Sequence, residues 1–255
     1  MGEVLIAVIG FVGGLVAGVI NTLAGNGSAI TLGILTDLMG LPANIANGTN
    51  RIGVFAQSIA SSYQMVSKNR DVVTKHKWIV VLTVAGAVIG VVIATLVSNE
   101  QFKFVYKYIM LVMLILILVK PAKWIRESAS STTVQNPWIL FPLTFIIGIY
   151  GGFIQLGMGI FYLATLVLIG NLGMKVSNIL KNFVVGIFTG IALLIFISNG
   201  MVDWKAGFFI ASGQALGGYL GGKYAVNSKY ASVAAYWILL AVILTVLVKQ
   251  FLFTA

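Results

Sequence analysis

Two short segments of the chain combine glycine with amide and hydroxyl side chains, a mixture suited to binding a small anion. Their candidate binding residues are Asn21, Gly25, Asn26, Gly27 and Ser28 in the first segment, and Gln155, Gly157 and Gly159 in the second. A helix that starts at flexible glycine presents unpaired N–H groups and about half a positive charge. Two such starts meeting inside a membrane would form an anion site, whereas other glycines, such as Gly86 and Gly90, are expected only to let helices pack closely.

A second pair of segments places a cation beside an asparagine. The candidates are Thr49, Asn50 and Arg51 in the first half, and Lys181 and Asn182 in the second, aligned so that Asn50 falls on Asn182. Hydroxyl and amide groups can hydrogen-bond the oxygens of an anion, and a cation several residues inside a membrane helix is costly enough to be a functional candidate. The alternative is that Arg51 and Lys181 extend along the helix to the membrane interface.

The residues that most enzymes and metal sites need are scarce. The chain has no cysteine, one histidine and six carboxylates among its 255 residues. Of these carboxylates, only Asp37 falls near the end of an expected apolar helix, and the sequence places no acid pair, histidine cluster or Ser-His-Asp grouping at one depth. We therefore expect no enzyme, no metal and no cofactor.

The composition indicates an all-α polytopic membrane protein without a separate soluble domain. Hydrophobic residues make up 59% of the chain and charged residues 9%, against about 25% in soluble domains, and the mean hydropathy is +1.03. The formal charge of +10 comes mainly from Lys and Arg between apolar runs. This placement favours contact with anionic lipid and a fixed membrane orientation over nucleic-acid binding.

Helical segments are expected in two sets of five. They are 4–24, 28–39, 45–67, 77–98 and 102–119, and then 137–156, 159–170, 177–198, 205–222 and 231–250. The second segment of each set has only about 12 residues, roughly 18 Å of helix, and cannot cross a hydrocarbon core of about 30 Å. Each is therefore expected to be a half-helix or a re-entrant segment that faces protein or water.

The two halves of the chain repeat one pattern. Gly10-Phe11-Val12-Gly13-Gly14 returns as Gly148-Ile149-Tyr150-Gly151-Gly152. We divide the chain into a first repeat at 1–119, a cytoplasmic linker at 120–136 and a second repeat at 137–255. Lys and Arg flank the last two segments of the first half, and this bias is reversed in the second half, which favours inverted repeats with both termini outside. Halves interrupted at corresponding places are typical of a transporter that binds its substrate at the breaks.

A longer motif points to a family. After a glycine break and a short helix, the run Gly40-Leu41-Pro42, then Ala46, then Gly48-Thr49-Asn50, resembles the sulfite exporter TauE/SafE family, also called the 4-toluene sulfonate uptake permease family. The likeness covers essentially the whole chain, including its size and its two-fold repeat. It implies transport of small sulfur-containing anions, sulfite or organosulfonates, across the bacterial inner (plasma) membrane.

The leading hypothesis is a secondary transporter that moves such an anion by alternating access, with the anion bound at the paired helix breaks near the midplane. The alternatives are a channel-like anion pathway and a membrane scaffold subunit that transports nothing. The expected partners are the anion and the lipid bilayer, with sodium or a proton as coupling ion. The sequence leaves the direction of transport and the oligomeric state open.

Overall fold

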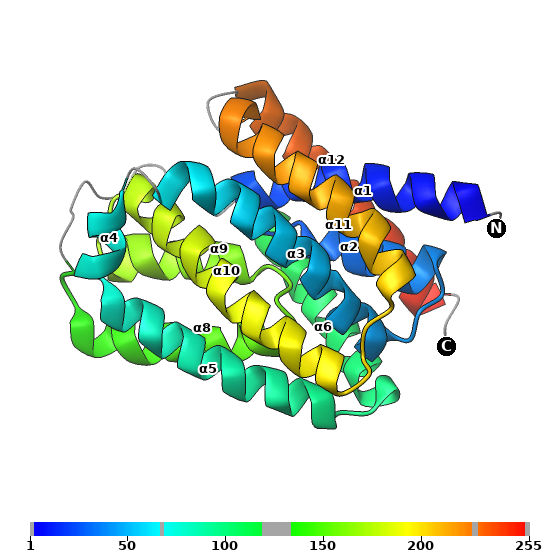
Figure 1. The fold of residues 1–255 in the computed structure, drawn as a ribbon, viewed down its shortest axis with the longest axis horizontal. Coiled ribbons are helices and arrows are strands. Elements are labelled where there is room, and N and C mark those ends of the chain that lie inside the picture. Colours follow the sequence, from blue (N-terminus) through cyan, green and yellow to red (C-terminus); the bar gives the residue numbers. More distant parts are fainter. Residues whose placement is uncertain (1–2, 67–68, 119–133, 226–228, 253–255) are drawn as a thin grey trace.

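The computed structural model describes residues 3–66, 69–118, 134–225 and 229–252, and its elements are helices (Figure 1). The first half contains α1 (Glu3–Ala24), α2 (Ser28–Gly33), η1 (Ile34–Leu38), α3 (Ala43–Val66), α4 (Arg70–Lys75), α5 (Lys77–Leu96) and α6 (Asn99–Leu118). The second half contains α8 (Pro137–Phe153), α9 (Met158–Ala164), η2 (Thr165–Ile169), α10 (Met174–Ser198), α11 (Trp204–Leu220), η3 (Gly221–Ala225) and α12 (Lys229–Leu252).

These bounds agree with the expected segments to within a few residues. The short helix α4 was not predicted, because four of its six residues are polar or charged and it lies between two long apolar runs. The cytoplasmic linker expected at 120–136 lies outside the described residues except for its last three. The all-helical prediction is confirmed for the described part of the chain.

The second element of each half is short, as its length in the sequence indicated. The helix α2 runs directly into the π-helical turn η1, and α9 runs into η2, which gives two composite apolar helices, Ser28–Leu38 and Met158–Ile169. Both are much shorter than a span of about 20 residues. Each composite helix follows a short non-helical segment, which we call a glycine gap. In the two glycine gaps, Gly25 and Gly157 adopt φ values of +74° and +68°, which glycine accepts without strain.

The most extensive helix pairs join the two halves. The helix α1 lies along α11, and α5 lies along α8. Glycine lets the backbones touch, since a Cβ added at Gly213 of α11 would lie 2.0 Å from the carbonyl oxygen of Phe11 in α1. The packing role expected for Gly86 and Gly90 is confirmed, because both face backbone atoms of α8. The first helix of each half is therefore held by a helix of the other half.

Helices that hold the same place in each half run in opposite directions in Figure 1. The helices α3 and α10 lie side by side, and α3 starts at the end where α10 finishes. The helices α1 and α8 also start at opposite ends of the molecule, as do α5 and α11. The first helix of the first half therefore starts at the opposite end of the molecule from the first helix of the second half.

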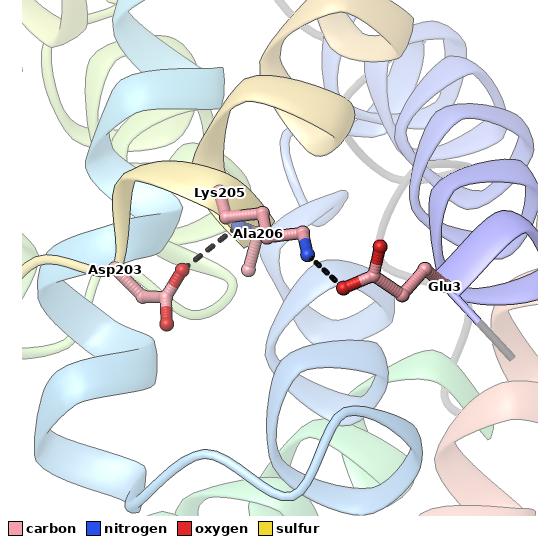
Figure 2. Close-up of polar contacts among 4 residues, drawn as sticks. All are labelled: Glu3, Asp203, Lys205 and Ala206. Carbon is pink, nitrogen blue, oxygen red and sulfur yellow. Dashed lines mark hydrogen bonds and ion pairs between the residues drawn. The ribbon is translucent and has the colours of Figure 1, made fainter. Parts of the chain in front are cut away.

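Polar contacts fix the N-terminal ends of α1 and α11 beside each other (Figure 2). Lys205 Nζ lies 2.5 Å from Glu3 Oε1, and Asp203 Oδ1 accepts a hydrogen bond from the Ala206 N–H at 2.9 Å, which caps α11. Both side chains of the ion pair are largely exposed, so solvent screens the pair and it adds little to stability. The glycine contacts along the two helices, rather than this pair, hold them together.

The outer surface of the bundle is apolar. Three of the described helices have segments long and apolar enough to cross a membrane, Glu3–Leu23, Lys77–Leu96 and Met174–Ser198. Large apolar side chains are exposed on several helices, among them Trp78, Ile93, Trp138 and Phe208. So much exposed apolar surface is unfavourable in water and suits lipid.

The packing of α5 against α8 predicts the effect of one methyl group. A Cβ at Gly152 would lie 2.0 Å from the carbonyl oxygen of Ala87, so we expect Gly152→Ala to lower the free energy of unfolding by about 1–3 kcal/mol, as overpacking does. The matched control is Gly222→Ala, where a Cβ meets nothing within 4 Å. Thermal unfolding of the detergent-purified variants measures both, and equal melting temperatures would contradict the close packing.

Candidate functional site

The candidate site centres on a contact between the two glycine-rich segments. A Cβ at Gly25 would lie 2.7 Å from the Cα of Gly159, and a Cβ at Gly159 would lie 2.6 Å from the Cα of Gly25. The contact is reciprocal and joins backbone to backbone, so no side chain fits between the two segments. The fold therefore brings the two gaps, which are far apart in the sequence, to one point.

A small cavity lies beside this contact. Its lining residues are Asn21, Gly25, Ser58, Gln155, Met158, Gly159, Lys181, Asn182 and Val185. Its volume is about 10 Å³, roughly enough for one water molecule. A polyatomic anion needs more room, so the helices around the cavity must move apart before such a ligand binds.

Lys181 supplies the charge of the cavity wall. Its side chain is 2% exposed, and its Nζ donates one long hydrogen bond of 3.5 Å to the carbonyl oxygen of Thr22, in the last turn of α1. An ammonium has three donors, and no carboxylate pairs with this one among the residues that the structure describes. Within the described part of the chain, the compensation seen for this buried cation is the partial negative charge of a helix end, so a bound anion would stabilise it.

Asn21 links the end of α1 to the start of α2 and to α3. Its Nδ2 donates to Gln57 Oε1 at 2.6 Å, and its Oδ1 accepts from the Gly27 N–H at 3.3 Å. Gln57 Nε2 in turn donates to Thr22 Oγ1 at 3.3 Å. This network fixes the geometry of the first gap at the edge of the cavity.

Arg51 is fully buried but does not line the cavity. Its Nη1 donates to the Gly151 carbonyl at 2.9 Å and to Gln155 Oε1 at 2.7 Å, and its Nη2 donates to the Gly152 carbonyl at 2.9 Å and to Asn47 Oδ1 at 3.2 Å. The two glycines belong to the last turns of α8, so the guanidinium sits at the negative end of that helix. Arg51 and Lys181 are both buried inside the bundle, which favours their interpretation as functional candidates over the alternative that they extend to the membrane interface.

Other predicted residues connect the elements around the site. Thr49 Oγ1 accepts from the Asp203 N–H at 2.9 Å, and Asn50 Oδ1 accepts from Thr31 Oγ1 at 2.5 Å. Asn26 is completely buried, and neither of its amide atoms has a partner within the described part of the chain. Of the predicted site residues, Asn21, Gly25, Gln155, Gly159, Lys181 and Asn182 line the cavity, while Asn26, Gly27, Ser28, Thr49, Asn50, Arg51 and Gly157 do not.

Sequence reasoning missed three lining residues and one positioning residue. Ser58, Met158 and Val185 line the cavity, and Asn47 donates from its Nδ2 to the Phe153 carbonyl at 2.8 Å beside the Arg51 guanidinium. Asn47 lies one helical turn before Arg51, and this spacing could have paired them. Met158 and Val185 are apolar, and nothing in their residue type distinguishes them from core residues.

The structure also shifts the alignment of the two Asn-cation motifs. Counted from the starts of α3 at Ala43 and α10 at Met174, Asn50 is equivalent to Lys181 and Arg51 to Asn182. The π-helical turns η1 and η2 share this spacing, since each starts the same number of residues before the following helix. The sequence alignment, which paired Asn50 with Asn182, was wrong by one residue.

Comparison with known proteins decides the family. The model of the family described as sulfite exporter TauE/SafE matches residues 10–249. The chain belongs to the sulfite exporter TauE/SafE family. Family membership and the names of its relatives point to membrane transport rather than to catalysis, and with the apolar helices they support a multi-pass membrane protein.

Relatives of this TauE/SafE protein come from several bacteria. The probable membrane transporter protein ORF9 of Sinorhizobium sp is 27% identical over 219 residues, which cover 85% of this chain and 82% of that protein. A probable membrane transporter protein of Haemophilus influenzae is 28% identical over 82% of this chain and 81% of its own length. The probable membrane transporter protein YfcA of Escherichia coli is 27% identical over 88% and 81%. No solved structure matches the chain.

The contact of Gly25 with Gly159 predicts a position-specific effect of alanine. Gly25 and Gly40 both have φ of +74°, so alanine at either carries the same left-handed backbone penalty of about 1–2 kcal/mol. A Cβ at Gly40 meets nothing within 4 Å, whereas one at Gly25 collides with the backbone of Gly159. We expect Gly25→Ala to be less stable than Gly40→Ala by about a further 1–3 kcal/mol in thermal unfolding. Equal stabilities would argue against the contact.

Proposed function

We propose that this protein is a secondary transporter of a small sulfur-containing anion, sulfite or an organosulfonate, in the bacterial inner (plasma) membrane. The observation that carries the proposal is the buried ammonium of Lys181, which lines a cavity where the two glycine gaps meet and lacks a carboxylate partner among the described residues. Family membership supplies the class of substrate. Buried cations with spare donors favour an anionic ligand over a neutral or cationic one.

The anion is proposed to bind beside the Gly25–Gly159 contact. Lys181 would contribute the full charge, and the N-terminal ends of Ser28–Leu38 and Met158–Ile169 would contribute backbone N–H groups and the positive ends of their dipoles. The amides of Asn21, Gln155 and Asn182 on the cavity wall would orient the oxygens of the ligand. One cation with several neutral donors can hold an anion and still release it.

Alternating access between two inverted repeats is proposed as the mechanism. Three features support it: equivalent helices run in opposite directions in Figure 1, α1 pairs with α11 as α8 pairs with α5, and each half has a short composite helix at the same place. A cavity too small for the ligand fits a contracted stage of such a cycle. Rocking of one half against the other would widen it toward one membrane face.

Replacing Lys181 tests the proposed binding site. A charge-assisted hydrogen bond contributes about 1.5–3 kcal/mol, so we expect Lys181→Gln to raise the KM for sulfite uptake into proteoliposomes by about 10- to 100-fold. Lys175→Gln, which removes an exposed lysine from the same helix, is the matched control, and Lys181→Arg should keep part of the affinity. A normal KM in folded Lys181→Gln protein would remove this lysine from the site.

The same vesicles separate the alternatives. The flux through a transporter saturates, and unlabelled substrate on the far side of the membrane accelerates it. The flux through a channel-like pathway shows neither saturation nor this acceleration. Separate sodium and pH gradients identify the coupling ion, because only the gradient of the coupled ion accelerates uptake. A scaffold subunit would give no flux at all and would tolerate changes on the cavity wall, provided that the protein stays folded.

A further inference from the structure

The helices α3 and α10, which carry Arg51 and Lys181, also carry hydroxyl residues at equivalent positions. Counted from the starts of α3 and α10, Ser58 and Thr189 hold the same position. Ser58 lines the cavity, next to Lys181 of the opposite helix. Thr189 instead accepts a hydrogen bond of 2.9 Å from Gln155 Nε2 and is completely buried. Thr189 is therefore enclosed by its neighbours, whereas Ser58 faces the cavity.

Arg51 and Phe196 belong to the same enclosed region as Thr189. Gln155 Oε1 accepts from Arg51 Nη1 at 2.7 Å, and the guanidinium carbon lies 5.6 Å from the centre of the Phe196 ring. Arg51, Thr189 and Phe196 are each at most 1% exposed. The guanidinium is held by four neutral oxygen acceptors, and its Nε has no partner among the described atoms. This closed position thus contains a buried cation with donor capacity left over.

The cavity and the closed position lie toward opposite ends of the molecule. The cavity uses the second half of α3, at Ser58, and the first half of α10, at Lys181, which is the end where α4 lies in Figure 1. Arg51 lies in the first half of α3, and Thr189 and Phe196 lie in the second half of α10. They are nearer to the connection between α10 and α11.

We propose that Arg51 marks a second binding position for a small oxyanion, equivalent to the one at Lys181 and closed in this state. This inference rests on the proposed function and extends it. When the helices open toward the other membrane face, an oxyanion replaces the amide oxygens of Gln155 and Asn47 on the guanidinium. The planar fork of arginine, including its spare Nε, suits two oxygens of one anion, and a full negative charge binds it more strongly than a neutral amide.

Gln155 connects the two positions. Its side chain belongs to the cavity lining, while its amide joins Arg51 to Thr189 on the closed side. Moving Gln155 away from Arg51 would change the wall of the cavity at Lys181. We therefore expect the two positions to open alternately, while the Gly25–Gly159 contact at the cavity wall stays in place.

The absence of cysteine from the chain allows a direct test with single-cysteine variants. Ser58→Cys and Thr189→Cys, in vesicles of fixed orientation, are treated with a membrane-impermeant thiol reagent from one face at a time. We expect Ser58→Cys to react from the face that carries Arg70 and Lys75. Thr189→Cys should react from the opposite face alone, at least about tenfold more slowly than Ser58→Cys. Adding Arg51→Gln should accelerate labelling of Thr189→Cys several-fold and slow that of Ser58→Cys.

The outcomes separate this inference from the proposed function. Sulfoacetate serves as the protecting anion, since sulfite itself consumes thiol reagents. In protein with Arg51 intact, the second position is overturned if Thr189→Cys reacts from the same face as Ser58→Cys or from neither face. This conclusion holds even if sulfoacetate protects Ser58→Cys. If no anion protects Ser58→Cys and no flux occurs, the proposed function itself fails. Because these readings use the Arg51-intact protein, misfolding of the Arg51→Gln variant would not obscure them.

Discussion

The arrangement of this protein depends on one backbone contact, between Gly25 and Gly159. Each residue lacks the side chain that would separate the two segments, and a Cβ at either would lie less than 3 Å from the Cα of the other. Two helices end and two short helices begin around this point, so their unpaired backbone groups gather in one small volume. In the apolar surroundings of a membrane, such groups need a polar partner, which is the physical reason for proposing a ligand site there.

The buried cations complement this geometry in a reciprocal way. Arg51 of the first half lies at the C-terminal end of α8, and Lys181 of the second half lies at the C-terminal end of α1. Each cation thus stabilises the helix end of the other half. The two differ in their hydrogen bonds: Arg51 makes four, whereas Lys181 makes one long bond and faces the cavity. This difference leaves the ammonium of Lys181 facing a small cavity, whereas the guanidinium of Arg51 is enclosed by its hydrogen-bond acceptors.

Much of the fold could be read from the sequence because the signals are local. Apolar runs bounded by glycine and charge gave the helix positions to within a few residues, and the short second elements follow from their length. The cavity was predicted only in part. Lys181, Asn21 and Gln155 stand out as polar residues in apolar segments, whereas Val185 and Met158 resemble any core residue. The one-residue shift between Asn50 and Lys181 shows that a degenerate repeat needs helix boundaries for its alignment.

The sequence by itself determined the class of protein, the helix positions and the two glycine gaps, because hydropathy and glycine act on the chain within a few residues. Only the tertiary structure decided that the gaps touch, that Lys181 lines the cavity, and that Arg51 binds the end of α8 instead. These contacts join residues more than 100 positions apart, such as Arg51 and Gln155. Their partners depend on how the two halves pack, which no local pattern specifies.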